Sequence, residues 1–168
     1  DKLQNPFNKF RYVPDYGETM LKVRNPKLFI WNISLGTLTR PAVAENIHPM
    51  SGVFSNGKIF FCGLDVPMKT HIPGISRCFN RPSSIYCLSG DAFNLSTKLT
   101  PDLYMALAPV VSANGDKMVF AGHSEKFSPH CTELDLFVIK DLMTHPNEPV
   151  RIDVVKSNPV EDPKVPTF

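Results

Sequence analysis

The chain has 168 residues, 42% of them hydrophobic, including 12 phenylalanines, so it carries enough apolar material for the core of one domain. Its 18 basic and 16 acidic residues give a net charge of +2. Neither sign forms a block, which argues against a nucleic-acid partner. No apolar run reaches the roughly 18 to 20 residues of a membrane-spanning helix, so no membrane association is expected.

Sixteen prolines are spread through the sequence and disfavour long helices, so the chain is predicted to be all-β. Short runs rich in β-branched and aromatic residues, bounded by turn-forming residues, indicate about nine strands. In chain order they cover residues 10–13, 28–33, 52–54, 59–62, 84–88, 108–111, 118–121, 134–139 and 150–155. Residues 1–9 are expected to be an N-terminal extension, 10–155 the folded segment, and the Pro-rich residues 156–168 a tail or linker.

Two segments of the sequence echo each other: "VFSNGKIFFCG" at 53–63 and "VVSANGDKMVFAGHS" at 110–124. In each, Asn-Gly separates two apolar runs, which is typical of a tight antiparallel hairpin. A third strand follows each hairpin after an irregular insert, and weaker fourth strands are expected near 96–100 and 150–155. Residues 27–40 resemble the outer half of an earlier unit.

Repeated four-stranded sheets predict a partial β-propeller, here of about two and a half to three blades, whereas closed rings typically have roughly 4 to 8. A β-sandwich is the alternative fold. An open arc leaves two apolar faces uncovered. We therefore expect either a segment of a larger propeller or association with further copies of the chain.

Several motifs have residue types suited to catalysis or metal binding, and each also has a plain structural explanation. Gly122-His123-Ser124 resembles half of a nucleophile elbow, but Lys126 replaces the second glycine. A zinc site built from "HSEKFSPHC" lacks an obvious fourth ligand, and the pair Glu133 and Asp135 fits a solvated strand edge better than an acid–base pair. No metal or other cofactor is expected. The four cysteines are interpreted as free thiols and the chain as cytoplasmic, with two disulfides in a secreted protein as the alternative.

The loop "GISRCFNRPSSIY" at 74–86 carries the two candidate site residues, Arg77 and Arg81. Their planar guanidinium groups would bind a carboxylate in bidentate fashion if the loop were functional. The structural alternative is that both arginines pair locally while Pro82 leads the chain into the next strand.

The same loop resembles a Gly-Ile-Arg-x-Cys-x-Asn-Arg-x-Ser-x-Leu-Tyr pattern in the propeller domain of acylpeptide hydrolases, in the prolyl oligopeptidase clan of serine peptidases. Two further segments are similar to that family in the same order: 12–38, which contains the run Asp15 to Glu18, and 123–142. In the loop, the matched positions are Gly74, Ile75, Cys78, Asn80, Arg81, Ser83 and Tyr86.

The resemblance implies that the propeller caps a C-terminal α/β-hydrolase domain, which is the implied partner of this chain and holds the catalytic triad. The chain itself is then non-catalytic. It would gate the access of short N-acylated peptides, with Arg77 and Arg81 as candidate gating residues. The alternative is a non-enzymatic protein-interaction module, a truncated or divergent propeller paralogue.

Overall fold

A computed structural model describes residues 6–12, 15–66, 74–75, 80–124 and 134–153. Within these residues the fold is all-β, with three antiparallel sheets, three short 3-10 helices and no α-helix. The predicted fold class is confirmed at this level. No helix in the described part is long and apolar enough to cross a membrane. The predicted tail at 156–168 lies outside the described residues, as does most of the insert that follows each predicted hairpin, at 67–73 and 76–79 and at 125–133.

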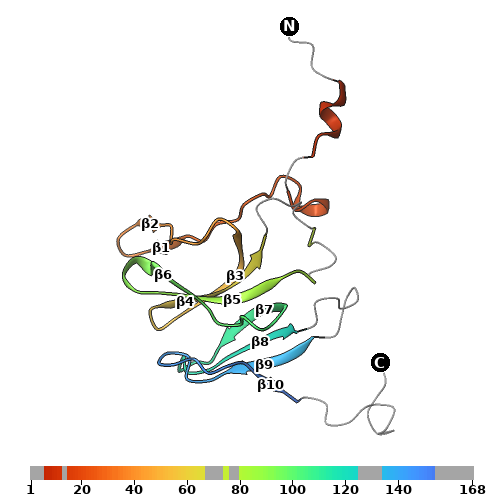
Figure 1. The fold of residues 1–168 in the computed structure, drawn as a ribbon. Coiled ribbons are helices and arrows are strands. Elements are labelled where there is room, and N and C mark those ends of the chain that lie inside the picture. The colour runs from red at the N-terminus through yellow and green to blue at the C-terminus, as the bar shows by residue number, and fades with distance from the viewer. Residues whose placement is uncertain (1–5, 13–14, 67–73, 76–79, 125–133, 154–168) are drawn as a thin grey trace, which may run out of the picture.

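The three sheets follow one another along the chain and form three layers (Figure 1). A two-stranded hairpin comes first, and each four-stranded sheet is a meander whose strands pair in sequence order. The hairpin consists of β1 (Ile30–Asn32) and β2 (Thr37–Thr39). The first sheet consists of β3 (Ile47–Ser55), β4 (Lys58–Asp65), β5 (Ser83–Ser89) and β6 (Leu95–Lys98). The second sheet consists of β7 (Met105–Val111), β8 (Met118–His123), β9 (Asp135–Ile139) and β10 (Val150–Ile152).

Both predicted Asn-Gly hairpins are present. Asn56 and Gly57 have φ values of 46° and 73°, so the two-residue turn between β3 and β4 uses the left-handed region that this residue pair tolerates. The turn between β7 and β8 is longer, and Gly115 within it has φ 80°. The two turns touch, because the Asn56 side-chain amide donates to the Asn114 carbonyl at 3.3 Å.

The two four-stranded sheets share one register. Val53 pairs with Phe60 in the first sheet as Val110 pairs with Val119 in the second. The next strands continue the match, because Phe61 lies opposite Tyr86, and Phe120 lies opposite Phe137. Both aromatic pairs are stacked, with ring centroids 5.4 and 5.5 Å apart. The sequence echo is therefore a structural repeat.

Each sheet has two faces that can be matched through this register, because neighbouring side chains along a strand point in opposite directions. We call the leading face the one that carries Ile59, Phe61, Tyr86 and Leu88 in the first sheet, and Met118, Phe120, Phe137 and Ile139 in the second. We call the trailing face the one that carries Phe60, Cys62, Ile85 and Cys87 in the first sheet, and Val119, Ala121, Leu136 and Val138 in the second.

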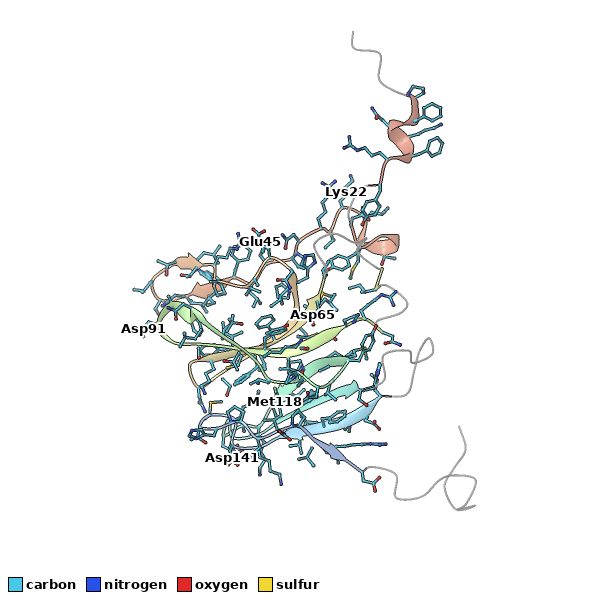
Figure 2. The ribbon with its side chains drawn as sticks, viewed as in Figure 1. Lys22, Glu45, Asp65, Asp91, Met118 and Asp141 are labelled. Carbon is cyan, nitrogen blue, oxygen red and sulfur yellow. The ribbon has the colours of Figure 1, made fainter. Side chains whose placement is uncertain are left out.

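The main core lies between the trailing face of the first sheet and the leading face of the second. Figure 2 labels one of its members, Met118, which is fully buried. A second cluster covers the leading face of the first sheet with Leu28, Ile30 and Val43, from the β1–β2 hairpin and its flanks. The hairpin layer therefore covers the leading face of the first sheet, and the trailing face of the first sheet covers the leading face of the second.

The structure corrects the prediction at the N-terminal end. The expected strand at 10–13 is absent from its described residues, because Pro6–Phe10 forms a 3-10 helix and Phe10 is 74% exposed. Two other 3-10 helices, Glu18–Met20 and Asp91–Phe93, are single turns. The inner strand β3 begins at Ile47, five residues before the predicted start, and a β-bulge between Pro49 and Gly52 accommodates the proline.

Candidate functional site

Polar side chains gather at one end of the two sheets, where β4 and β8 end and β5 and β9 begin. We call this the polar end, and define it by Asp65, Asn80, Ser83 and His123. Both long inserts of the sequence, between β4 and β5 and between β8 and β9, leave the sheets here. Figure 2 labels Asp65 at this end of the first sheet. Because loops on a rigid scaffold commonly carry function, the polar end is the candidate site.

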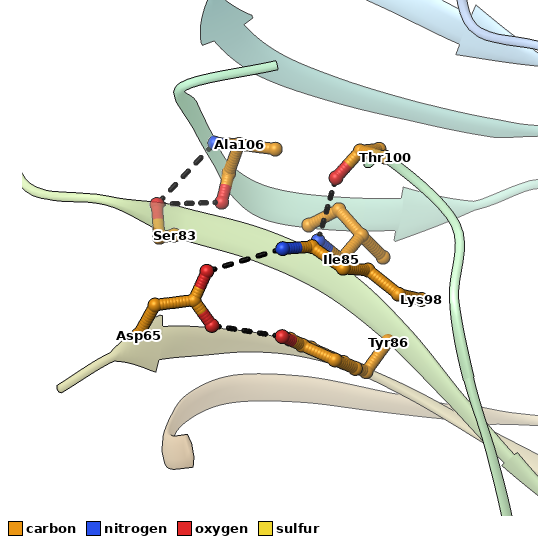
Figure 3. Close-up of polar contacts among 7 residues, drawn as sticks. All are labelled: Asp65, Ser83, Ile85, Tyr86, Lys98, Thr100 and Ala106. Carbon is orange, nitrogen blue, oxygen red and sulfur yellow. Dashed lines mark hydrogen bonds and ion pairs between the residues drawn. The ribbon is translucent and has the colours of Figure 1, made fainter. Parts of the chain in front are cut away.

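A buried hydroxyl joins the two sheets at the polar end (Figure 3). Ser83 is 1% exposed, and its Oγ donates to the carbonyl of Ala106 at 3.1 Å and accepts from the amide of Ala106 at 3.3 Å. The backbone amide of Ser83 also donates to the Tyr104 carbonyl at 3.1 Å. These bonds fix the start of β5 against β7.

Asp65 receives two side chains from the outer strands of the first sheet (Figure 3). The Tyr86 hydroxyl donates to Asp65 Oδ1 at 2.8 Å, and Lys98 Nζ lies 3.1 Å from Asp65 Oδ2. Burial raises the pKa of Tyr86, and the hydrogen bond to Asp65 raises it further, so the phenol stays protonated at neutral pH. The arrangement ties three strands together and presents no free general base.

A second tyrosine pairs with a buried histidine nearby. The Tyr16 hydroxyl and His48 Nδ1 are 2.5 Å apart, and both residues are at least nine-tenths buried. Burial raises the pKa of Tyr16 to about 12. Burial, and secondarily the positive charge of Lys27, lowers the pKa of His48. The bond therefore joins a neutral phenol to a neutral imidazole and anchors the N-terminal segment to β3.

The first insert contacts the second sheet through Asn80. Its Oδ1 lies 3.2 Å from His123 Nε2, and because an amide oxygen only accepts, this nitrogen carries the proton. The His123 ring also packs on Tyr104, with centroids 5.6 Å apart. His123 is 5% exposed, and its Nδ1 has no hydrogen-bond partner in the described part of the chain.

The predicted candidate Arg81 lies at the polar end, and Arg77 lies outside the described residues. Arg81 directs one terminal nitrogen to the Asn80 carbonyl at 2.8 Å and the other to the Gly74 carbonyl at 2.7 Å. These bonds match the structural interpretation of the loop. A gating role for either arginine remains a prediction.

The two described cysteines lie in the core rather than at the polar end. The buried thiols of Cys62 and Cys87 are free, as predicted for them, and Cys78 and Cys131 fall outside the described ranges. Burial raises the pKa of the Cys62 thiol to about 11 and also raises that of Cys87, so both are poor nucleophiles. Among the described side chains, no group of three His, Cys, Asp or Glu could hold a metal. Two residues of the candidate zinc site, His130 and Cys131, lie outside the described residues.

Sequence reasoning missed the contacts of the polar end other than Arg81. Asp65 and Tyr86 stand 21 positions apart, and Tyr16 and His48 stand 32 apart, so no short motif contains them. The only signal was that a polar residue closes the strand at Asp65.

No known family model matches the chain, and no curated protein is significantly similar to it.

Proposed function

We propose that this chain is an arc of a β-propeller that acts as the non-catalytic cap of a serine hydrolase of the acylaminoacyl-peptidase type. The observation that supports a propeller is which face of each sheet packs against the neighbouring sheet. In a propeller each blade covers one neighbour with one face and the other neighbour with its opposite face. Here the first sheet is covered on its leading face by the hairpin layer and packs its trailing face against the leading face of the second sheet.

The outermost face argues against the alternative β-sandwich. In a sandwich the outer side of each sheet is solvated and polar. Here Val110, Val119, Val138 and Val150 form one row across the trailing face of the second sheet. Val110 is 66% exposed and Val150 57%, whereas Phe60, which matches Val119 in the first sheet, is fully buried. Such a face suits coverage by a further sheet.

The capping role is supported by the sequence resemblance and by the polar end. Three of the matched loop positions make contacts there: Asn80 and Ser83 bind His123 and Ala106 of the second sheet, and Arg81 binds the Gly74 carbonyl within the insert. These three residues fix the start and the end of a loop at the polar end, and a gate for short N-acylated peptides requires a loop fixed in such a position. The uncovered valine row favours the second candidate, a protein-interaction module that recruits a partner sheet.

Hydrolysis of a chromogenic N-acylated amino acid tests the cap. We expect no turnover from the 168-residue chain alone and turnover from the longest natural polypeptide that contains it. In that polypeptide Arg81→Ala should increase kcat/KM for a long N-acetylated peptide relative to a short one, because the insert loses its anchor on Gly74. Arg151→Ala, which removes an exposed ion pair with Asp135, is the matched control. Turnover by the isolated chain, or an inactive polypeptide, would reject the proposal.

A further inference from the structure

An apolar groove of about 410 Å³ runs between the β1–β2 hairpin and the inner strands of the first sheet. One wall is the segment 28–31 and the other is formed by 52–54 and Ile59. Two aromatic side chains of the first wall, Phe29 and Trp31, are 58% and 66% exposed, and Phe54 on the second wall is 63% exposed. Three large apolar side chains around one groove are more than scattered surface hydrophobicity.

The first wall of the groove also has an open strand edge. Ile30 packs against the leading face of the first sheet as Cys87 packs against the leading face of the second, so β1 corresponds to β5 in the repeat. Strand β5 is paired on both edges, with β4 and with β6. Strand β1 pairs with β2 alone among the described strands, which leaves its other edge with unpaired backbone groups.

The next unit shows what occupies the equivalent space. In the second step of the stack, β7 packs against β3, β4 and β5 together. In the first step, the leading face of the first sheet is covered from the corresponding direction by β1 and its flanks. The positions that match Phe54 and Ile59 in the second sheet are Val111 and Met118, and both pack in the main core together with Phe60 and Cys62 of β4. The groove is thus the place that the β3–β4 hairpin fills one unit later.

We propose that this groove binds an apolar β-hairpin whose second strand pairs antiparallel with the open edge of β1. Backbone hydrogen bonds to the edge would supply affinity, and alternate side chains facing Phe54 and Ile59 would supply selectivity. The occupant is a separate hairpin segment of this chain's own repeat type, with apolar runs on either side of Asn-Gly. Its turn would lie beside Asn56, because the turns of adjacent units already touch there.

A second folded copy of the chain is a poor occupant. Its β3–β4 and β7–β8 hairpins are each paired along the outer strand, with β5 and with β9. It therefore has no inner hairpin to offer without opening a sheet. The inference rests on the propeller arrangement in the proposed function but not on the hydrolase, so failure of the binding test and failure of the hydrolysis assay are separate results.

The only tryptophan of the chain lies in the groove wall and reports on its occupancy. The probe is a synthetic peptide with the sequence of residues 109–122, PVVSANGDKMVFAG. Saturating peptide should shift Trp31 emission to shorter wavelength and lower its acrylamide quenching constant by about threefold, since strand addition takes the ring out of water. The matched peptide PVVSANGDKMPFAG, with proline in the pairing strand, should have no effect.

A pair of chain variants locates the binding. Phe54→Glu should abolish the peptide effect, because it places a charge in the groove, and the side chain is exposed enough to be replaced without unfolding. Leu35→Glu, at a 73% exposed position outside the groove lining, should bind as the original chain does. Equal responses to both peptides, a response that survives Phe54→Glu, or no response at all would overturn the proposal. So would concentration-dependent burial of Trp31 without peptide, which would identify a second copy as the occupant.

Discussion

Ser83→Ala should destabilise the fold by about 2 kcal/mol, because one hydroxyl couples the first sheet to the second. Ser83 Oγ makes two hydrogen bonds to the backbone of Ala106 and is closed off from solvent. A buried polar group that loses its partner costs roughly 1–3 kcal/mol. The Ala106 carbonyl keeps a weak bond from the Cys62 thiol at 3.3 Å, which places the expected loss near the middle of that range.

Urea unfolding followed by far-ultraviolet circular dichroism measures this loss. In a thermal scan the midpoint should fall by about 4–8 °C, since a domain of this size loses roughly 2–4 °C per kcal/mol. Ser96→Ala, on the exposed strand β6, is the matched control and should change stability by less than about 0.5 kcal/mol. If Ser83→Ala were as mild as Ser96→Ala, the hydroxyl would not couple the sheets.

Two further perturbations test other parts of the fold. The pKa of His48 is lowered by burial, so the neutral ring is favoured in the native state. The contribution of the neutral ring to the free energy of unfolding is therefore present above pH 6.5 and is lost as the pH falls below that value. In His48→Phe, the free energy of unfolding should no longer fall in this way when it is measured at decreasing pH. Val119→Lys should reduce self-association in sedimentation velocity, because it breaks the exposed valine row, whereas Val23→Lys, at a 43% exposed position outside that row, should not. If the two lysine variants self-associated to the same extent, the valine row would not be the surface through which the chain self-associates.

The hairpins could be predicted from the sequence because their determinants are local. Asn56 and Gly57 supply the positive φ that the turn demands, and the flanking apolar runs supply both strands. The run at 10–13 has the same strand chemistry but no described partner strand, and the preceding residues form a 3-10 helix instead. Strand propensity without a neighbour to pair with is a weak determinant.

The polar end could be predicted only as the place where the inserts leave the sheets. Its contacts depend on tertiary register: Asp65 reaches Tyr86 and Lys98 because three strands pair with a particular offset. A shift of one residue would turn Tyr86 to the other face. The same holds for the two sheet faces, since Phe61 and Phe60 are equally apolar in sequence, and only the pairing assigns them to the leading and trailing face.

Stacking in one sense has a consequence for the two inserts. In a head-to-tail stack, the same connection of every unit emerges at the same end, so inserts that differ in sequence become neighbours in space. The contact between Asn80, which closes the first insert, and His123, which opens the second, is the first instance. Each further unit added on the valine row would bring its own insert to the end of the second sheet that carries His123. Inserts of different sequence at the same end of similar sheets allow such a scaffold to bind different partners while its core stays the same.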